Sequence, residues 1–546
     1  MKTLALMIAA VVTGIPVLAG ILITLVKALD SGAWSIVLST PGVWRALELS
    51  VATGAVATII ALAIAHVTVA LAGPAHWSSQ LRAAIVPLLA MPHLATAIGL
   101  ALLLSPAGLI VRLLSPAVTG FQQPPDWMTI QDARGLALTV GLVVKEVPFL
   151  TFVLLGALGQ VPSERLMLTC RALGYGRLQS WLVAVAPLLQ RQIRLPIAAV
   201  FAFGVTNVEM AIPLGPQTPP TFGILLWQWF TASRLELQGA AYAGTVLLVG
   251  TTVSGLLAGW VAGRVGNAVL GRITASGRRI VRDGWLRNAA LALPLIVAVL
   301  GLGAVASLAA RAGSGMWRFP RVLPDHFSWV TYSSAASVAG APIGMTVLTA
   351  AVVTLVAIAI TLLLIELLEY SPYWRRRVGI AVFVPLVVPQ FGFLFGLTWL
   401  LTRLRLEGTL LAVIWSHVVF ALPYTWGILA GARASLDSRY LLAARTLGSG
   451  PMRAWWTVTA PLLLRSMLLA AAIAFTVSTA LYLPTLFAGA GRVITIATEA
   501  ASAAASGNLR TAAVYGALQA LLPLAAFAVA SVGGHVLFRR YRGVSR

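Results

Sequence analysis

The sequence predicts an all-α membrane protein with about twelve transmembrane helices, arranged as two parallel six-helix repeats. Three observations predict this fold class. The 546 residues are 59% hydrophobic and 10% charged, with a mean hydropathy of +0.92, which is too apolar for a soluble domain. About a dozen stretches reach the roughly 20 apolar residues that a spanning helix needs. The third observation is an internal repeat, in which one segment of the first half recurs in the second.

The apolar stretches divide evenly around a basic interruption. In the first half we expect spans at about residues 5–26, 46–72, 83–104, 136–159, 194–213 and 239–263. In the second half we expect them at about residues 289–310, 345–368, 378–401, 408–431, 466–487 and 511–537. The first stretch is longer than the core of a secretory signal, so we expect it to be retained as a helix. The predicted organisation is a first half over 1–263, a basic cytoplasmic linker over 264–288, and a second half over 289–546.

The net charge of +23 would suggest nucleic-acid binding in a soluble protein. Here most of the 38 Lys and Arg residues fall at span ends, including Arg375 to Arg377 and the linker GRVGNAVLGRITASGRRIVRDGWLRN. Basic residues accumulate on the cytoplasmic side of membrane proteins. We therefore expect a multi-pass protein of a bacterial inner membrane with both termini cytoplasmic, in contact with lipid and with no nucleic acid.

The sequence lacks the common motifs for ATP hydrolysis, metal binding and nucleophilic catalysis. Its three lysines, Lys2, Lys27 and Lys145, lie outside any GxxxxGK[ST] phosphate loop, so the chain cannot hydrolyse ATP by that mechanism. Cys170 is the only cysteine, and there is no HExxH or GxSxG sequence. We expect no enzymatic activity, no catalytic residue, and no cofactor or metal held by this chain.

The internal repeat is strongest in a segment that we expect to be cytoplasmic. RLMLTCRALGYGRLQSWLVAVAPLLQR (Arg165–Arg191) aligns without gaps to RYLLAARTLGSGPMRAWWTVTAPLLLR (Arg439–Arg465), 274 positions later. A weaker pair, MPHLATAIGL and VPQFGFLFGL, begins at Met91 and Val388, 297 positions apart. Both pairs fall at corresponding places in their halves, which predicts parallel repeats.

The repeated segment can be interpreted in two ways. An amphipathic surface helix with arginines at lipid phosphates would explain the charge. It would not explain a glycine followed thirteen positions later by a proline, twice. A short helix that ends at a left-handed turn at Gly174 or Gly448, then a second segment reaching Pro187 or Pro461, predicts a compact elbow between two spans. Such an elbow could dock into a groove on a partner.

With LAARTLG and an AP pair at this spacing, the segment resembles the EAA loop of binding-protein-dependent ABC importer permeases. The resemblance implies a type I ABC importer fold, in which this loop couples to the ATPase. Two halves in one chain resemble the ferric-iron and thiamine importer permeases and the YnjC-like permeases, and KEVPFL at Lys145–Leu150 favours the last. Both copies depart from the motif, because its acidic position is occupied by Leu168 and Leu442.

The resemblance implies partners and coupling residues. The partners are two copies of an ABC ATPase subunit and a periplasmic substrate-binding protein. The coupling residues are those at motif positions and the polar residues beside them: Glu164, Arg171, Gly174 and Pro187 in the first half, and Asp437, Ala443, Ala444, Arg445, Gly448 and Pro461 in the second.

Ionisable residues inside spans are expensive and therefore are candidates for the translocation path. Lys145 and Glu146 are adjacent in the fourth span and need not pair with each other, since helix neighbours point about 100° apart. Asn207 and Glu209 lie toward the external end of the fifth span, and we expect Leu481 to be the second-half counterpart of Glu209. Glu209 could equally be a silent carboxylate bonded to a neighbouring helix. We expect His93 and His417 to be hydrogen-bonded core residues.

Two other classes of protein fit parts of the pattern. A secondary transporter of the major facilitator class also has twelve helices and a basic central linker, but its loop between spans two and three carries an acid. The loop AGPAHWSSQLR (Ala72–Arg82) has none. A membrane-embedded enzyme would need converging ionisable groups, and the 15 acidic residues lie mostly at span ends. The sequence leaves the substrate open among amino acids, thiamine, polyamines, ferric iron and oxyanions.

Overall fold

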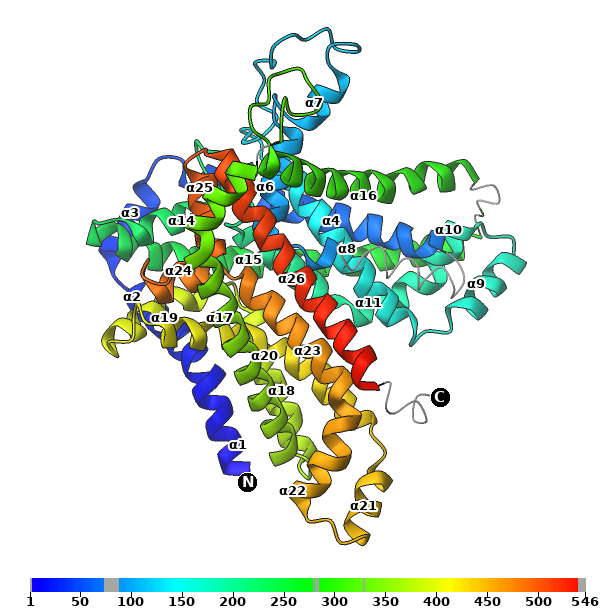
Figure 1. Cartoon of the computed structure of the whole chain (residues 1–546). Coiled ribbons are helices and arrows are strands. Elements are labelled where there is room, and N and C mark those ends of the chain that lie inside the picture. The colour runs from blue at the N-terminus through cyan, green and yellow to red at the C-terminus, as the bar shows by residue number, and fades with distance from the viewer. Residues whose placement is uncertain (1, 73–87, 278, 280–283, 328, 539–546) are drawn as a thin grey trace. The chain divides into compact units, whose positions relative to one another are not determined.

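The computed structural model describes residues 2–72, 88–277, 279, 284–327 and 329–538. Within these residues all regular secondary structure is helical. Ten described helices are long and apolar enough to cross a membrane, and two sharply bent helix pairs bring the total to as many as twelve. The prediction of an all-α polytopic membrane protein with about twelve spans is confirmed (Figure 1).

The first half contains six candidate spans and the short helices that connect them. Its helices are α1 (Lys2–Ala9), η1 (Ala10–Ala19), α2 (Gly20–Lys27), α3 (Ser31–Ser39), α4 (Val43–Ala72), α6 (His93–Leu104), α7 (Leu109–Leu114), α8 (Leu136–Leu158), α9 (Ser163–Ala172), α10 (Arg177–Ser180), η2 (Trp181–Val185), α11 (Ala186–Gln192), α12 (Arg194–Thr206), α13 (Ala211–Leu214), α14 (Phe222–Thr231) and α15 (Leu235–Ala275).

The second half contains the remaining candidate spans, again connected in part by short helices. Its helices are α16 (Gly284–Gly313), α17 (Trp329–Leu367), α18 (Pro372–Val387), α19 (Phe391–Arg403), α20 (Leu410–Ser435), α21 (Ser438–Thr446), α22 (Pro451–Ala454), η3 (Trp455–Thr459), α23 (Ala460–Ala480), α24 (Leu483–Gly489), α25 (Ile496–Ala505) and α26 (Leu509–Phe538).

The third span is interrupted at a proline in both halves. In the second half α18 and α19 meet at Pro389 with a bend of 98°. In the first half α6 begins directly after Pro92, and residues 83–87 of the predicted span lie outside the described residues. Proline has no N–H and disfavours the α conformation of the residue before it, so a helix ends there. The Met91 and Val388 segments of the weaker repeat therefore occupy the same structural position.

Each elbow segment contains a π-helical turn just before its AP pair. η2 and η3 begin at Trp181 and Trp455, 274 positions apart, as the sequence repeat requires. In each turn an N–H bonds five residues back, from Ala186 to the Trp181 carbonyl and from Ala460 to the Trp455 carbonyl. The following proline cannot donate, and its ring would clash with the carbonyl four residues earlier, so the wider turn accommodates it.

The described helices form two compact units that exchange the first spans of the two halves. One unit combines described residues within 1–23 with those within 337–499 and 518–546, and the other combines 24–336 with 500–517. In the first unit α1 and η1 pack against α18, α19 and α20. In the second, α16 packs against α4, α6 and α8. Each unit thus contains the first span of the opposite half, an arrangement that the repeat alone did not predict.

Close backbone contacts mark where the exchanged helices cross the third spans. A Cβ at Gly99 of α6 would lie 2.5 Å from the carbonyl oxygen of Ala304 in α16. Gly396 of α19 meets Gly20 of the first span in the same way. Gly99 and Gly396 are 297 positions apart, which is the offset of the weaker repeat. Small residues allow membrane helices to approach this closely, so both crossings depend on them.

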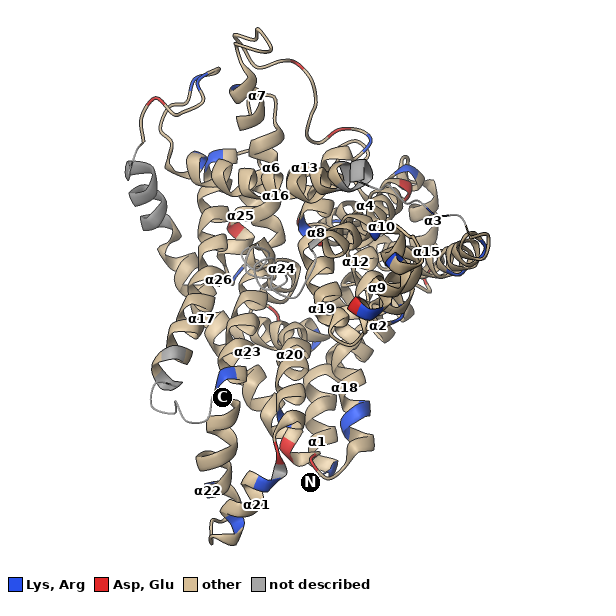
Figure 2. Ribbon diagram, turned by 90° about the vertical axis from the view of Figure 1, so that its right-hand side faces the viewer, with Lys and Arg blue, Asp and Glu red and all other residues tan. Residues whose placement is uncertain are grey.

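Part of the predicted linker, 264–288, is helical. Residues from Arg264 to Ala275 continue helix α15, and α16 begins at Gly284. Gly277, two residues after the end of α15, has a φ of +69°. Figure 2 shows Lys and Arg mostly near helix ends and in connecting segments. The division into sequence halves and the cytoplasmic orientation of both termini stay predictions.

Candidate functional site

The two elbows have the same backbone geometry. Gly174 has a φ of +90° and Gly448 a φ of +84°, so the predicted left-handed turns are confirmed. The N–H groups of Gly174 and Tyr175 donate to the carbonyls of Arg171 and Cys170. This is a Schellman motif, which satisfies the last carbonyls of a helix and favours glycine at the left-handed position.

The second elbow repeats the Schellman motif bond for bond. The N–H groups of Gly448 and Ser449 donate to the carbonyls of Arg445 and Ala444, at 3.0 Å each. At its start the Asp437 carboxylate accepts from the Arg439 N–H at 2.9 Å and caps α21. Two separate segments of one chain therefore present a short helix, a fixed turn and a second helix with the same geometry.

The outer faces of the elbows are apolar as well as charged. Leu168 and Leu442, which occupy the acidic position of the motif, are 65% and 56% exposed. Leu173, Leu182, Leu447, Met452 and Trp456 are also exposed. Glu164, Arg171, Ala443 and Arg445 are exposed beside them, whereas Ala444, Pro187 and Pro461 are half-buried. The surface can bury aliphatic side chains against a partner where the usual motif offers a carboxylate.

The first elbow is fastened to its unit by two side-chain hydrogen bonds. Arg177 donates from Nε to the Ala70 carbonyl at 3.0 Å, and Trp181 donates from Nε1 to His66 Nδ1 at 3.2 Å. His66 lies in α4, so both bonds connect the elbow to the end of the second span. Sequence analysis missed His66, although it is an ionisable residue inside a span and could have been found by that rule.

The second elbow is fastened differently. Arg433, near the end of α20, forms ion pairs with Glu366 and Glu369, and Arg375 donates to the Ala430 carbonyl at 2.7 Å. Trp455, the repeat partner of Trp181, has its Nε1 buried without a hydrogen-bond partner in the part of the chain that the structure describes. Sequence analysis did not identify Arg433 and its two carboxylates, because their spacing in the chain gives no local signal.

The predicted path residues Lys145, Glu146, Asn207 and Glu209 are all buried in one unit. The Lys145 ammonium donates to the carbonyls of Leu88, Leu89 and Met91, next to the break before Pro92. These carbonyls have no helical continuation to bond, and a cation at a helix end is favourable. Lys145 therefore stabilises the break itself.

Glu146 faces a different neighbour from Lys145, as expected for adjacent helix positions. Its Oε1 lies 3.7 Å from Nε2 of His93, whose ring centroid is 4.5 Å from that of Phe203. Glu146 and Glu209 are the two carboxylates that act electrostatically on Lys145. The cluster thus contains one Lys, one His and two Glu.

Asn207 and Glu209 follow the end of α12, where the chain leaves the helix. The Asn207 Oδ1 accepts from the Met210 N–H at 2.8 Å, and its Nδ2 is buried without a partner among the described residues. α12 ends at Thr206 and α23 at Ala480, an offset of 274. By this offset the counterpart of Glu209 is Leu483, so the expected assignment to Leu481 is wrong by two positions.

The second half has a neutral polar cluster in place of the charged one. His417 bonds through Nδ1 to Ser478 Oγ at 2.9 Å and through Nε2 to Thr485 Oγ1 at 2.8 Å. This confirms His417 as a hydrogen-bonded core residue. Among the described residues no group of three or more His, Cys, Asp or Glu is arranged to hold a metal ion.

Comparison with known proteins shows which proteins the chain is similar to. Over 526 residues the chain is 29% identical to the inner membrane ABC transporter permease protein YnjC of Escherichia coli (strain K12). The match covers 95% of this chain and 93% of that protein. The chain is therefore similar over nearly its whole length to an ABC transporter permease. The molybdenum transport system permease proteins ModB of Mycobacterium tuberculosis and Mycobacterium bovis are each 32% identical over 127 residues, covering 21% of this permease and 48% of theirs. No family model matches the chain.

This homology fixes the coarse function. The permease is a transport subunit rather than an enzyme, a multi-pass protein of the inner membrane that works with ATPase subunits. The predicted resemblance to YnjC-like permeases is confirmed. The loop that argued against a facilitator lies outside the described residues except for Ala72.

Proposed function

We propose that this permease forms the translocation path of an importer, and that its two elbows each dock one copy of an ATPase subunit. A periplasmic binding protein would deliver a small solute to the external loops, and ATP-driven closure of the ATPases would move the elbows and switch the path between outward-open and inward-open states. Both termini would then be cytoplasmic.

One observation carries this proposal: the chain holds two exposed elbows with identical Schellman turns, 274 positions apart. Contact with a single ATPase subunit would need only one elbow. Figure 1 shows α9 and the α21–α22 pair beyond the ends of the spans that flank them, where a partner could reach them. The duplicated geometry is suited to a partner that is itself present twice.

Leu168 and Leu442 can contribute to binding of the ATPase subunit in place of the acidic residue that the motif usually has. Burying a leucine side chain contributes about 1.5–3 kcal/mol, whereas an exposed ion pair contributes about 0–1 kcal/mol. Leu168 and Leu442 can therefore replace a rim salt bridge with a stronger apolar contact. Glu164, Arg171, Asp437 and Arg445 would set the orientation of the partner rather than its affinity.

Glycine substitutions test the elbows. Val at Gly174 or Gly448 must adopt a positive φ, which costs roughly 1–2 kcal/mol and redirects the elbow. No atom of the described residues lies within 4 Å of a Cβ at Gly448, so the effect comes from the backbone rather than from crowding. We expect both variants to insert normally but to recover less ATPase on co-purification and to lower substrate-stimulated ATP hydrolysis, with the double variant worst.

The matched control is Gly450→Val in the same elbow. Gly450 has a φ of −63° and equally open surroundings, so Val fits there without strain. It should retain wild-type ATPase recovery. Equal recovery by the Gly174/Gly448 double variant, or loss of recovery in Gly450→Val to the same extent, would contradict the proposed docking.

Orientation is tested by a reporter fused after Gly277. An even number of spans precedes this position, and the surrounding segment is basic, so the reporter should be cytoplasmic. A periplasmic signal would reverse the proposed topology and place both elbows out of reach of an ATPase.

A further inference from the structure

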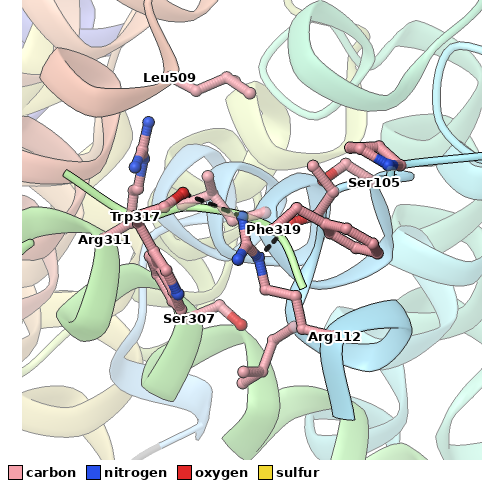
Figure 3. Close-up of a pocket in the computed structure, with 11 residues that line it drawn as sticks. Ser105, Arg112, Ser307, Arg311, Trp317, Phe319 and Leu509 are labelled. Carbon is pink, nitrogen blue, oxygen red and sulfur yellow. Dashed lines mark hydrogen bonds between the residues drawn. The ribbon is translucent and has the colours of Figure 1, made fainter. Parts of the chain in front are cut away.

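A cavity of about 370 Å³ lies within one compact unit, and its lining includes no residue of the elbows or of the buried Lys145 cluster. Its walls come from the α6–α7 connection, the end of α16, the segment after it and the start of α26 (Figure 3). The residues that matter here are Arg112, Ser307, Arg311, Trp317 and Phe319. No role described above involves these residues.

Arg112 builds the wall of the cavity rather than offering donors to it. Its Nε donates to the Ala107 carbonyl at 2.8 Å, and Nη1 to the carbonyls of Arg318 and Arg321 at 2.9 and 2.8 Å. Its guanidinium also lies 4.8 Å from the ring centroid of Trp317. These bonds hold the segment after α16 against α7, so the shape of the cavity is preorganised.

Two polar groups remain available on the α16 side. Ser307 is 2% exposed, and its Oγ has no hydrogen-bond partner among the described residues. Arg311 lies one helical turn later on the same face, and its side chain has no ion pair with any described carboxylate. A buried hydroxyl without a partner is costly and calls for a ligand or water.

The local charge is positive. Arg510, at the start of α26, acts electrostatically on Arg311, so two guanidinium groups repel each other beside the cavity. The nearby carboxylate of Asp325 is paired with Arg321. An anion bound at Arg311 would relieve the repulsion, and a guanidinium presents two parallel N–H donors that match the oxygens of an oxyanion.

We propose that this cavity is an oxyanion-binding site, in which Arg311 and Ser307 donate to a phosphate-like group. The group is either a free inorganic oxyanion or the phosphate of an anionic lipid. The proposal concerns binding to this chain alone and does not depend on the proposed import function.

The test uses the purified full-length chain and inorganic phosphate as the probe. Equilibrium dialysis with labelled phosphate at constant ionic strength should give saturable binding, with chloride as the competing anion. Arg311→Gln should weaken it at least tenfold and Ser307→Ala several-fold. Arg318→Gln removes the same charge from an exposed side chain outside the cavity lining and should bind as the wild type does.

A second arm distinguishes the source of the oxyanion. Native mass spectrometry from nanodiscs of phosphatidylglycerol or of phosphatidylcholine reports retained lipid. Retention of phosphatidylglycerol by the wild type but not by Arg311→Gln identifies a lipid phosphate, and phosphate binding without lipid retention identifies a free oxyanion. The proposal is overturned if Arg311→Gln binds phosphate and lipid as well as the wild type does. Any effect of this variant on binding of a partner protein would not change that conclusion.

Ser307→Ala separates a binding role from a structural one. Removing a buried hydroxyl that has no partner should leave the melting temperature unchanged or raise it. Loss of phosphate binding with an unchanged melting temperature supports the site. A lowered melting temperature with unchanged phosphate binding would assign Ser307 to packing and contradict the proposal. This result decides the question even if Arg311→Gln fails to insert into the membrane.

Discussion

Gly20 in the first span and Gly396 in α19 bring their backbones into direct contact, although 376 positions separate them. A Cβ at Gly396 would overlap the carbonyl oxygen of Gly20, and a Cβ at Gly20 would overlap that of Phe393. The crossing binds the first span to a helix of the opposite half of the sequence. It has a repeat counterpart at Gly99 and Ala304, where α16 crosses α6.

Gly396→Val should therefore destabilise the unit that contains it. Overpacking a tight contact costs about 1–3 kcal/mol, and here the obstructing atoms belong to backbone that cannot rotate away. We expect a lower melting temperature of the purified permease and easier proteolysis near the first span. Gly344→Val in α17 is the control, since no atom in the described part of the chain lies within 4 Å of a Cβ there. A Gly396 variant as stable as the Gly344 variant would show that the helices separate at no cost.

Lys145→Met should also lower stability, through the break before Pro92. The ammonium satisfies carbonyls of Leu88, Leu89 and Met91 inside the bundle. Hydrogen bonds to a charged group contribute about 1.5–3 kcal/mol, and the carbonyls left behind pay the cost of burial without a partner. The melting temperature should fall, while Lys2→Met at the exposed end of α1 should not change it. An unchanged melting temperature in Lys145→Met would mean that water replaces the ammonium.

Glu209→Gln separates a path residue from a silent carboxylate. If the charge of Glu209 contacts the solute, transport should fall while expression and ATPase recovery stay normal. If Glu209 only balances Lys145, transport should persist. The measurement is solute uptake in proteoliposomes with the ATPase, with Glu48→Gln on the exposed part of α4 as the control. Equal uptake by wild type and Glu209→Gln would remove this residue from the path.

Much of the fold could be predicted because membrane spans obey a local rule. Each needs about 20 apolar residues, and most of the predicted stretches coincide with described helices. The fifth and eleventh spans begin more than ten residues earlier than predicted, at Arg177 and Pro451. The elbows were predictable too, since a left-handed turn requires glycine at one position and Gly174 and Gly448 repeat it.

Contacts between residues far apart in the sequence could not be predicted in the same way. Nothing near Gly20 in the sequence indicates that it contacts α19, and nothing near Arg433 indicates Glu366. The Ser307 and Arg311 cavity likewise depends on how α6, α16 and α26 converge. The assignment of Leu481 as the counterpart of Glu209 failed. Both residues lie beyond the ends of α12 and α23, where the two halves can be aligned only by the positions of the helix ends in the structure.

The repeat provides a matched pair of substitutions in the elbows, Trp181→Phe and Trp455→Phe. Both tryptophans begin a π-helical turn at the same repeat position, and Phe retains most of the aromatic packing while removing the indole N–H. Trp181 donates to His66 Nδ1 at 3.2 Å, whereas the buried Nε1 of Trp455 has no partner among the described residues. A hydrogen bond contributes about 0.5–1.5 kcal/mol, and removing a buried donor without a partner is neutral or favourable.

Trp181→Phe should therefore lower the melting temperature and loosen the first elbow, and Trp455→Phe should leave the melting temperature unchanged or raise it slightly. Differential scanning fluorimetry of the two variants and of the double variant measures both effects. His66→Ala in the Trp181→Phe background supplies the control, because the second substitution no longer breaks that bond and should cost less than His66→Ala alone. If the two tryptophan variants lose equal stability, packing rather than the His66 bond fastens the elbows, and the proposed difference between the two halves is wrong.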